Sequence, residues 1–295
     1  MIHTLVPMLV AVVPVILFGL LIEAVRRGEE TRQRRDPFVS EFLRPAGYGR
    51  QRTVDTLQLD LALTFGFGLA LPLWFYSVWL TLGKNTLGPS WTGWLYAGLG
   101  LASFVYFLIR TVVIYRGLSR TRLDLDGEAA SGQEFDRLMR AGARVFHDMP
   151  GNGSNIHHIV VGATGVLAVE SMAHPRPERQ RGTADASVSF DGRQLRFPDH
   201  REEEAVRRAR DNARWLGDWL SAALNEPIEV RPVLALPGWI VERQGLSDVT
   251  VLNPRDCARH LQGQPKLSEK MQERVAFQIE RACRNERPDK RRRRR

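Results

Sequence analysis

A short stretch near the middle of the chain contains the residues best suited to chemistry. It reads "NIHHIVVGATGVLAVESM" and runs from Asn155 to Met172, with His157 and His158 at its start and Glu170 near its end. Imidazole suits Zn²⁺ and other transition metals, whereas a carboxylate also suits Mg²⁺. Neighbouring strand residues point to opposite faces, so we expect structural roles for His157 and His158 rather than a shared ion. Glu170 either binds a cation or pairs with an arginine.

Two strands must position these side chains. "IHHIVVG" and "VLAVES" are apolar runs of strand length around the turn "ATG", and together they predict a β-hairpin. Ahead of them, "SGQEFDRLMRAGARVF" has apolar residues at helical spacing and begins with an S-x-x-E capping box, Ser131 and Glu134. The intervening "HDMPGNGSN" is typical of a turn-rich connector.

The residues after this hairpin predict a second hairpin, two helices and two strands. Asp191-Gly192 is a hairpin turn signal, and "REEEAVRRARDNARWLGDWLSAAL" is a long amphipathic helix with an i,i+4 pair from Glu204 to Arg208. "IEVRPVLALPG" and "VTVLNP" predict strands, and "LSEKMQERVAFQIERAC" predicts a final helix. This order indicates an α/β domain whose mixed sheet is flanked by helices.

Three apolar runs precede this domain. They extend over Thr4–Ile22 within residues 1–22, over Leu61–Leu82 and over Gly93–Tyr115. Each is long enough to cross the roughly 30 Å hydrocarbon core of a bilayer as a helix. The first lacks the basic start of a cleaved signal peptide, because "MIHT" contains no lysine or arginine. We therefore predict three transmembrane helices that serve as an anchor, since no row of acidic or polar residues indicates a transport path.

The placement of arginine predicts the orientation of these helices. The segment 23–60 is rich in arginine, whereas the short loop from Gly83 to Thr92 carries only Lys84, and further arginines follow Tyr115. By the positive-inside rule, the N-terminus lies outside, 23–60 is a basic cytoplasmic loop, and the C-terminal domain is cytoplasmic. The sequence thus predicts a multi-pass protein of the cell membrane.

The whole chain is basic, with a net charge of +9 and a pI of about 10.2. Such a charge attracts nucleic acid and anionic lipid headgroups. Within the C-terminal helix and basic tail, 262–295, the run Arg291–Arg295 is expected to hold one of these two, in addition to the bilayer as a partner. The sequence names no protein partner. Cys257 and Cys283 lie far apart without a CxxC motif, which indicates neither a disulfide framework nor a thiolate metal site.

The order of these elements and the central hairpin resemble the NERD (nuclease-related) domain, a family related to the PD-(D/E)xK restriction-endonuclease-like fold. Its members read approximately "N-I-D-H-I-V-V-G-P-x-G-V-F-V-I-E-x-K" at this point. The resemblance covers residues 126–261 and implies three transmembrane helices followed by a cytoplasmic restriction-endonuclease-like domain. The matching positions are Asn155, Ile156, His158, Ile159, Val160, Val161, Gly162, Gly165, Val166, Val169 and Glu170.

The resemblance also implies metal-assisted phosphodiester hydrolysis. In the family, an Asp and a Glu on adjacent strands hold Mg²⁺, and a Lys two residues after the Glu orients the attacking water. Carried over by position, Glu170 matches the Glu and is the one hairpin position left to hold a metal ion. His157 stands at the Asp position, and Met172 stands at the Lys position.

An acidic residue of the first helix assists in the family, and its position in this chain is ambiguous. The family pattern is Gly-Glu. Here Gln133 follows Gly132, while Glu134 and Glu128 lie close by. The resemblance therefore implies Gln133 or Glu134 at this position, with Glu128 as a neighbour.

Two of the three hairpin positions have lost their usual chemistry. His157 removes an anionic oxygen ligand, and Met172 replaces a cation with an apolar side chain. Arg176 and Arg179 follow in the next loop, but arginine is a poor proton-transfer group. We therefore expect a catalytically degenerate module, without a cofactor, that binds or scaffolds at the cytoplasmic membrane face. The alternative is an active DNA or RNA nuclease with a rearranged site that uses Mg²⁺ or Mn²⁺.

Overall fold

The protein divides into two compact units. One comprises Met1–Pro37 and Thr53–Thr121, and the other comprises Phe38–Arg52 and Arg122–Arg295. Within these, the computed structural model describes Leu20, Ala24, 42–80, 91–175, 187–260 and 263–284. The first predicted span, apart from Leu20, and the tail Arg291–Arg295 lie outside the described residues, as do Arg176 and Arg179.

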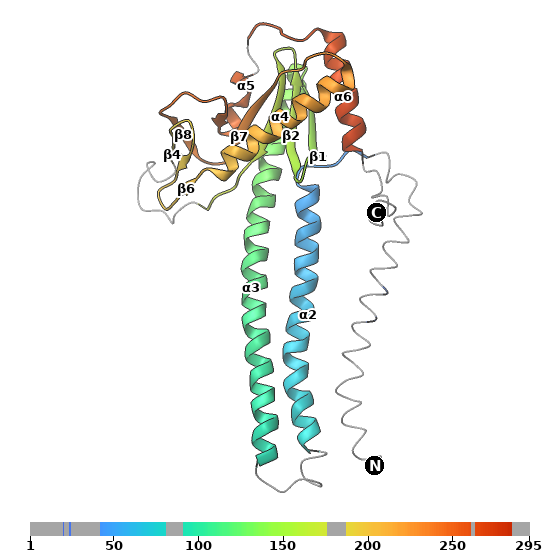
Figure 1. Cartoon of the computed structure of the whole chain (residues 1–295), viewed down its shortest axis with the longest axis vertical. Helices are drawn as coiled ribbons and strands as arrows, with labels where there is room; N and C mark the ends of the chain where they lie inside the picture. Colours follow the sequence, from blue (N-terminus) through green and yellow to red (C-terminus); the bar gives the residue numbers. More distant parts are fainter. Residues whose placement is uncertain are drawn as a thin grey trace. The chain divides into compact units, whose positions relative to one another are not determined.

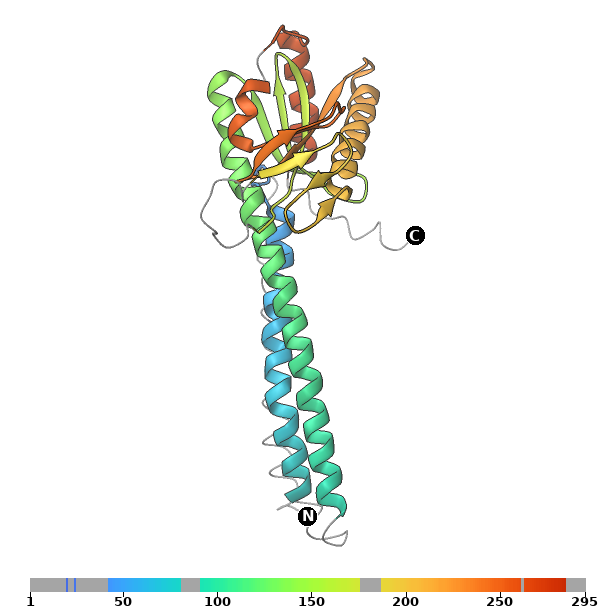
Figure 2. The ribbon, with the colours of Figure 1, turned by 90° about the vertical axis from the view of Figure 1, so that its left-hand side faces the viewer.

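The first unit contains most of two long helices, α2 (Tyr48–Val78) and α3 (Trp91–Asp136), which lie side by side there (Figures 1 and 2). The first residues of α2 and the last residues of α3 belong to the second unit. Both are long and apolar enough to cross a membrane. Their close approach depends on Gly68, because a Cβ there would lie 3.0 Å from Phe107 Cβ. Many of their large apolar side chains are exposed, including Leu73, Leu101 and Val113.

The helix α3 continues well past the predicted end of the third apolar run at Tyr115. The expected capping box is therefore wrong, because Ser131 lies inside α3 and its Oγ donates a 2.8 Å hydrogen bond to the Gly127 carbonyl one turn earlier. The short 3₁₀ helix η2 (Arg137–Ala141) follows and ends at Gly142, which has a positive φ of 85°. The left-handed backbone at this glycine ends the helix.

The strand β1 (Arg144–Pro150) comes next, where the sequence indicated the end of a helix and a connector. It pairs antiparallel with β2 (Asn155–Gly162), which pairs antiparallel with β3 (Gly165–Ser171), so the predicted hairpin is confirmed. β7 (Val230–Ala235) lies parallel to β3, and β9 (Thr250–Leu252) lies parallel to β7. The resulting five-stranded sheet has the order β1-β2-β3-β7-β9 and is mixed, as predicted.

Helices cover both faces of this sheet (Figure 2). On one face, α4 (Glu204–Leu224) and α6 (Glu269–Cys283) bury an apolar cluster that includes Leu216, Leu220 and Ile279. On the other face, residues of α3 and η2 pack on the sheet. The short helices η4 (Pro254–Asp256) and α5 (Cys257–His260) follow β9. The α/β class with a mixed sheet flanked by helices is therefore confirmed.

A smaller sheet of order β6-β5-β4-β8 lies beside the large one. Its strands are β4 (Ser187–Phe190), β5 (Leu195–Arg196), β6 (Arg201–Glu202) and β8 (Ile240–Arg243). The predicted hairpin at Asp191 joins β4 to β5, and the Asp191 carboxylate accepts hydrogen bonds from the backbone N–H groups of Arg193 and Gln194. Fully buried Trp239 lies in the apolar cluster behind this sheet.

The segment 42–52 belongs to the α/β unit, although the sequence placed it in the basic loop 23–60. Leu43 forms a β-bridge with Arg284, and the Gly49 N–H donates a 3.0 Å hydrogen bond to Asp148 Oδ2. The helix α2 begins within this segment, at Tyr48. This arrangement brings residues that precede α2 against residues of α3 and β1.

Candidate functional site

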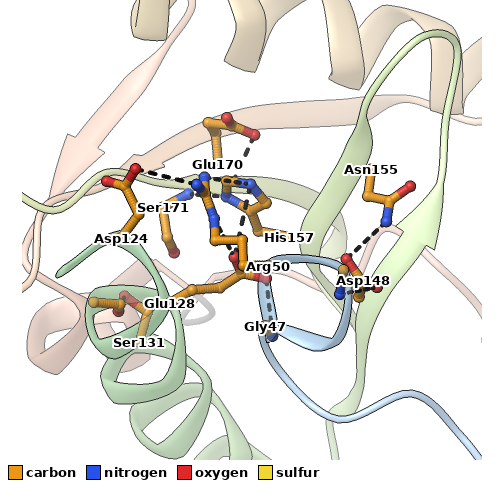
Figure 3. A network of polar contacts seen from close by, with 12 residues as sticks. Gly47, Arg50, Asp124, Glu128, Ser131, Asp148, Asn155, His157, Glu170 and Ser171 are labelled. Carbon is orange, nitrogen blue, oxygen red and sulfur yellow. Dashed lines mark hydrogen bonds and ion pairs between the residues drawn. The ribbon is translucent and has the colours of Figure 1, made fainter. Parts of the chain in front are cut away.

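Side chains from three elements meet where β2 begins and β3 ends. His157 lies on β2, Glu170 on β3, and Glu128 on the last turns of α3. His157 Nδ1 is 3.6 Å from Glu170 Oε2, and His157 Nε2 is 3.9 Å from Glu128 Oε2. Figure 3 shows these side chains around Arg50. The structure therefore brings together the two hairpin positions and an acidic residue of the preceding helix.

Glu128, rather than Gln133 or Glu134, is the helix residue that reaches this site. It is 1% exposed, whereas Gln133 is exposed and Glu134 forms a 2.7 Å ion pair with Arg137. Sequence reasoning preferred the later positions because it started the helix at Ser131. The helix begins much earlier, at Trp91, and a residue one turn before Ser131 faces the sheet.

A glycine allows α3 to approach the end of β3 at this point. A Cβ on Gly127 would lie 2.5 Å from the Cβ of Ala173, which is shorter than real side chains allow. Gly127 directly precedes Glu128, and this pair is a Gly-Glu, as in the pattern that the resemblance supplies. That adjacency was the signal from which Glu128 could have been identified.

Arg50 is the cation of the site, and sequence reasoning missed it. Its Nε donates a 2.8 Å hydrogen bond to Glu128 Oε2, and its Nη1 donates a 3.2 Å hydrogen bond to Asp124 Oδ2. Its Nη2 lies 3.1 Å from His157 Nε2. The Glu128 carboxylate also accepts a 3.0 Å hydrogen bond from the Gly47 N–H. Residues separated by 78 positions carry the central ion pair, so no local pattern could have revealed it.

Burial controls the protonation of the two glutamates. Glu170 is 4% exposed, and its burial raises its pKa from 4.5 to about 7, against the lowering effects of the Arg208 and Arg50 cations. Burial likewise raises the pKa of Glu128, although Arg50 opposes this shift. Near neutral pH, the protonated and the ionised forms of Glu170 are therefore both populated. The protonated form lacks the negative charge that attracts a cation, so Glu170 is a weakened cation ligand.

His157 is held neutral in this environment. Burial, followed by the Arg50 and Arg208 cations, lowers its pKa to about 3. Its Nδ1 accepts a 2.9 Å hydrogen bond from the Ser171 N–H, so the neutral ring carries its proton on Nε2. Arg50 Nη2 and His157 Nε2 then face each other as two donors, and the carboxylates rather than the imidazole hold Arg50 in place.

A second cation reaches Glu170 from α4. Arg208 Nε lies 3.4 Å from Glu170 Oε1, and Asn212 Nδ2 donates a 3.3 Å hydrogen bond to Glu170 Oε2. The sequence predicted that Arg208 pairs with Glu204, but Glu204 pairs with Arg207 instead. Glu170 therefore pairs with an arginine, which is one of the two roles expected for it.

Met172 has no part in this polar network. Its half-buried side chain packs against the apolar cluster of the smaller sheet, which includes Leu236 and Trp239. The backbone N–H of Met172 donates a 3.0 Å hydrogen bond to the Ala235 carbonyl, which continues the pairing of β3 with β7. The position that would hold a catalytic lysine in the family therefore serves packing here.

The adjacent His158 has different partners from His157. Its Nδ1 lies 2.8 Å from His147 Nδ1, and its Nε2 lies 3.0 Å from Ser171 Oγ. Its ring packs 5.1 Å from the ring of Phe135 in α3. His147 continues the chain to Asp136, with its Nε2 3.0 Å from Oδ1. These contacts give His158 a packing and hydrogen-bonding role between β1, β3 and α3.

Mg²⁺ does not fit the residues at this site. Mg²⁺ takes oxygen ligands in near-octahedral geometry, but an imidazole stands at one of the three positions. The Arg50 guanidinium already neutralises Glu128 and Asp124, and a dication beside it would meet a like charge. The arrangement holds two strands, α3 and the segment 42–52 together by charge and hydrogen bonds.

Comparisons of this chain with protein-family models, with curated proteins and with solved structures found no match.

Proposed function

We propose that this protein is a membrane-attached module with a nuclease-related fold that acts by binding or scaffolding, and not by metal-dependent phosphodiester hydrolysis. The observation that carries this proposal is the position of Arg50. Its guanidinium lies against Glu128 and Asp124 and reaches His157, at the place where the resemblance to NERD domains implies a divalent cation. An internal cation thus replaces the metal ion.

Two features of the α/β unit support a nuclease-related fold. The antiparallel hairpin of β2 and β3 follows α3, and α4 then leads to a strand parallel to β3, in the order that the resemblance implies. His157 lies 3.6 Å from Glu170 and 3.9 Å from Glu128, and the resemblance assigns site roles to these two strands and to the preceding helix.

The groups present do not supply the chemistry of hydrolysis. A general base acts best with a pKa near the working pH, whereas the pKa of His157 is about 3. The cations beside the carboxylates are both arginines, which do not exchange protons near neutral pH. The pKa of Glu170, about 7, suits a general base, but its Oε1 faces Arg208 and its Oε2 faces Asn212.

Membrane attachment determines which partners the α/β unit could meet. α2 and α3 are candidate membrane spans, and the arginine-rich residues around them favour a cytoplasmic α/β unit. In that orientation the unit faces anionic lipid headgroups and cytoplasmic nucleic acid. The run Arg291–Arg295 has the charge to bind either.

A cleavage assay tests the proposal. The full chain, purified in detergent, is incubated with DNA and with RNA in the presence of Mg²⁺, Mn²⁺ and Zn²⁺ in turn. We expect no cleavage above the background of the Glu170→Ala variant. Metal-dependent cleavage by the wild-type protein that is lost in Glu170→Ala would overturn the proposal in favour of an active nuclease with a rearranged site.

A second experiment tests whether Arg50 takes the place of the metal ion. Mn²⁺ binding is measured by electron paramagnetic resonance for the triple variant Arg50→Ala, His157→Asp, Met172→Lys. The matched control carries Arg140→Ala in place of Arg50→Ala, because Arg140 is an exposed arginine of η2. We expect binding by the first triple variant only. Equal Mn²⁺ binding by both would show that Arg50 does not close the site.

A further inference from the structure

A second cluster of ionisable side chains lies beyond the end of β3. It consists of His174, Asp199 and His200. His174 follows β3, whereas Asp199 and His200 lie in the turn between β5 and β6. His174 Nε2 lies 3.1 Å from Asp199 Oδ1 and 3.2 Å from Asp199 Oδ2, and His200 Nδ1 lies 3.0 Å from Asp199 Oδ1. One ligand atom from each of the three residues lies within 4.8 Å of the other two.

These separations suit a transition-metal ion. Zn²⁺ binds imidazole nitrogen and carboxylate oxygen at about 2.0–2.2 Å in tetrahedral sites, which places neighbouring ligand atoms roughly 3.3 Å apart. The two imidazole-to-carboxylate distances of 3.0 and 3.1 Å are already close to this value. A small increase in the separations of the three side chains would therefore admit an ion. Bonds from the ion to these side chains would then replace the present hydrogen bonds.

The two imidazole rings are held in place by aromatic neighbours. Phe197 lies 4.6 Å from the His174 ring and stacks at 4.8 Å on the His200 ring, as centroid separations. Trp239 packs against His174, and its Nε1 donates a 3.2 Å hydrogen bond to the His174 carbonyl. The turn is closed by a 2.9 Å hydrogen bond from the Phe197 N–H to the His200 carbonyl. Fixed ring orientations lower the ordering cost of binding an ion.

The charge and exposure of the cluster also favour a cation. The His174 side chain is 15% exposed, whereas Asp199 is 65% exposed, so one side of the cluster is open to solvent. The Asp199 carboxylate lies within hydrogen-bond distance of both His174 and His200. In the described part of the chain, its ion-pair partners are the two histidines, and no arginine or lysine neutralises it.

We propose that His174, Asp199 and His200 form a binding site for Zn²⁺ or a similar transition-metal ion, with a fourth coordination position open to solvent. The ligand set of two imidazoles and one carboxylate selects such ions over Mg²⁺, which prefers oxygen ligands alone. This site is separate from the Arg50 cluster and does not depend on the function proposed above.

A cobalt titration tests this site. The full chain in detergent is stripped with a chelator and titrated with Co²⁺, whose visible absorption reports tetrahedral coordination, and Zn²⁺ affinity is then measured by competition with a chromogenic chelator. We expect one equivalent of metal per chain. Asp199→Asn should lower the affinity at least about tenfold, since the loss of outer-shell partners alone costs that much in metal sites.

Two controls complete the experiment. Asp218→Asn, at an exposed position of α4, should bind metal like the wild-type protein, and Mg²⁺ should not compete. Zn²⁺ should also raise the melting temperature of the wild-type protein but not that of Asp199→Asn, since an ion that binds the folded state stabilises it by mass action. The absence of saturable binding, or equal affinity in wild type and Asp199→Asn, would show a hydrogen-bonded surface cluster and overturn the proposal.

Discussion

The two ionisable clusters at the end of β3 both combine imidazoles with carboxylates but differ in which groups neutralise the carboxylates. Glu170 and His174 are only four positions apart in the chain. The cluster at Glu170 is buried and contains Arg50 and Arg208, whereas the cluster at His174 is open to solvent and has no arginine or lysine partner among the described residues. The comparison shows that burial, rather than residue type, determines whether a cluster needs an internal cation.

The physical reason is desolvation. A buried carboxylate loses the hydration that stabilises its charge, so it must be paired, be hydrogen-bonded or take up a proton. Glu128 is paired with Arg50, while Glu170 has its pKa raised to about 7. Asp199 is 65% exposed and keeps much of its hydration, so its contacts with His174 and His200 can be exchanged for an ion from solution.

Removing Arg50 should have the largest effect. Arg50→Ala leaves Glu128 buried without its cation, and we expect the free energy of unfolding to fall by about 3 kcal/mol, the lower end for a broken buried ion pair. Thermal or denaturant unfolding of the full chain in detergent measures this change. Arg140→Ala is the control and should stay within about 0.5 kcal/mol of the wild-type protein. Equal stability of the two variants would mean that Arg50 is not needed to compensate the buried cluster.

The next effect is a dependence of stability on pH, with opposite signs for the two groups. The pKa of Glu170 is raised from 4.5 to about 7, so its contribution to stability is present at low pH and is lost as the pH rises through this window. The pKa of His157 is lowered from 6.5 to about 3, so its contribution is present above 6.5 and is lost as the pH falls. In the pH range where both groups titrate, a rise in pH therefore lowers the stability contributed by Glu170 and raises that contributed by His157.

Single variants separate these contributions. As the pH rises from about 5 to about 7, the stability advantage of the wild type over Glu170→Gln should shrink, on the order of 2 kcal/mol. As the pH rises from about 4 to about 6.5, the stability advantage of the wild type over His157→Gln should grow by a similar amount. Denaturant unfolding of the three proteins at matched pH values measures both. Differences that do not vary with pH would show that the two side chains are not desolvated as the buried cluster requires.

The smallest effect is expected at the exposed cluster. Without metal, Asp199→Asn should melt at the same temperature as the wild-type protein, because a hydrated carboxylate contributes little through its hydrogen bonds. Calorimetry in the presence of a chelator measures this. A marked loss of stability would remove the contrast with Arg50→Ala and indicate that the cluster at His174 is also a structural one.

Much of the fold follows from local patterns in the sequence. The helices α4 and α6 and the strands β2, β3, β7 and β9 lie where periodicity and turn residues predict them. The strand β1 was missed because "ARVF" continues the helical spacing of the residues before it and "HDMPGNGSN" is rich in turn residues. Pairing with β2 stabilises β1, and no local pattern reports that pairing.

The candidate site was predicted only in part, for a similar reason. His157, Glu170 and Met172 were found because they share one hairpin with an identifiable motif. Arg50, Asp124 and Arg208 were missed, because each reaches the site from an element that is distant in the chain.

The sequence by itself determined most of the elements, two of the apolar helices and the residue types at the hairpin, because hydrophobic periodicity and turn chemistry are local properties. Only the tertiary structure decided which charges meet. It brings Arg50 against Glu128 and Arg208 against Glu170, and it leaves Asp199 facing solvent beside two histidines. Electrostatic interactions depend on separation in space and on burial, and neither quantity can be read from positions along the chain.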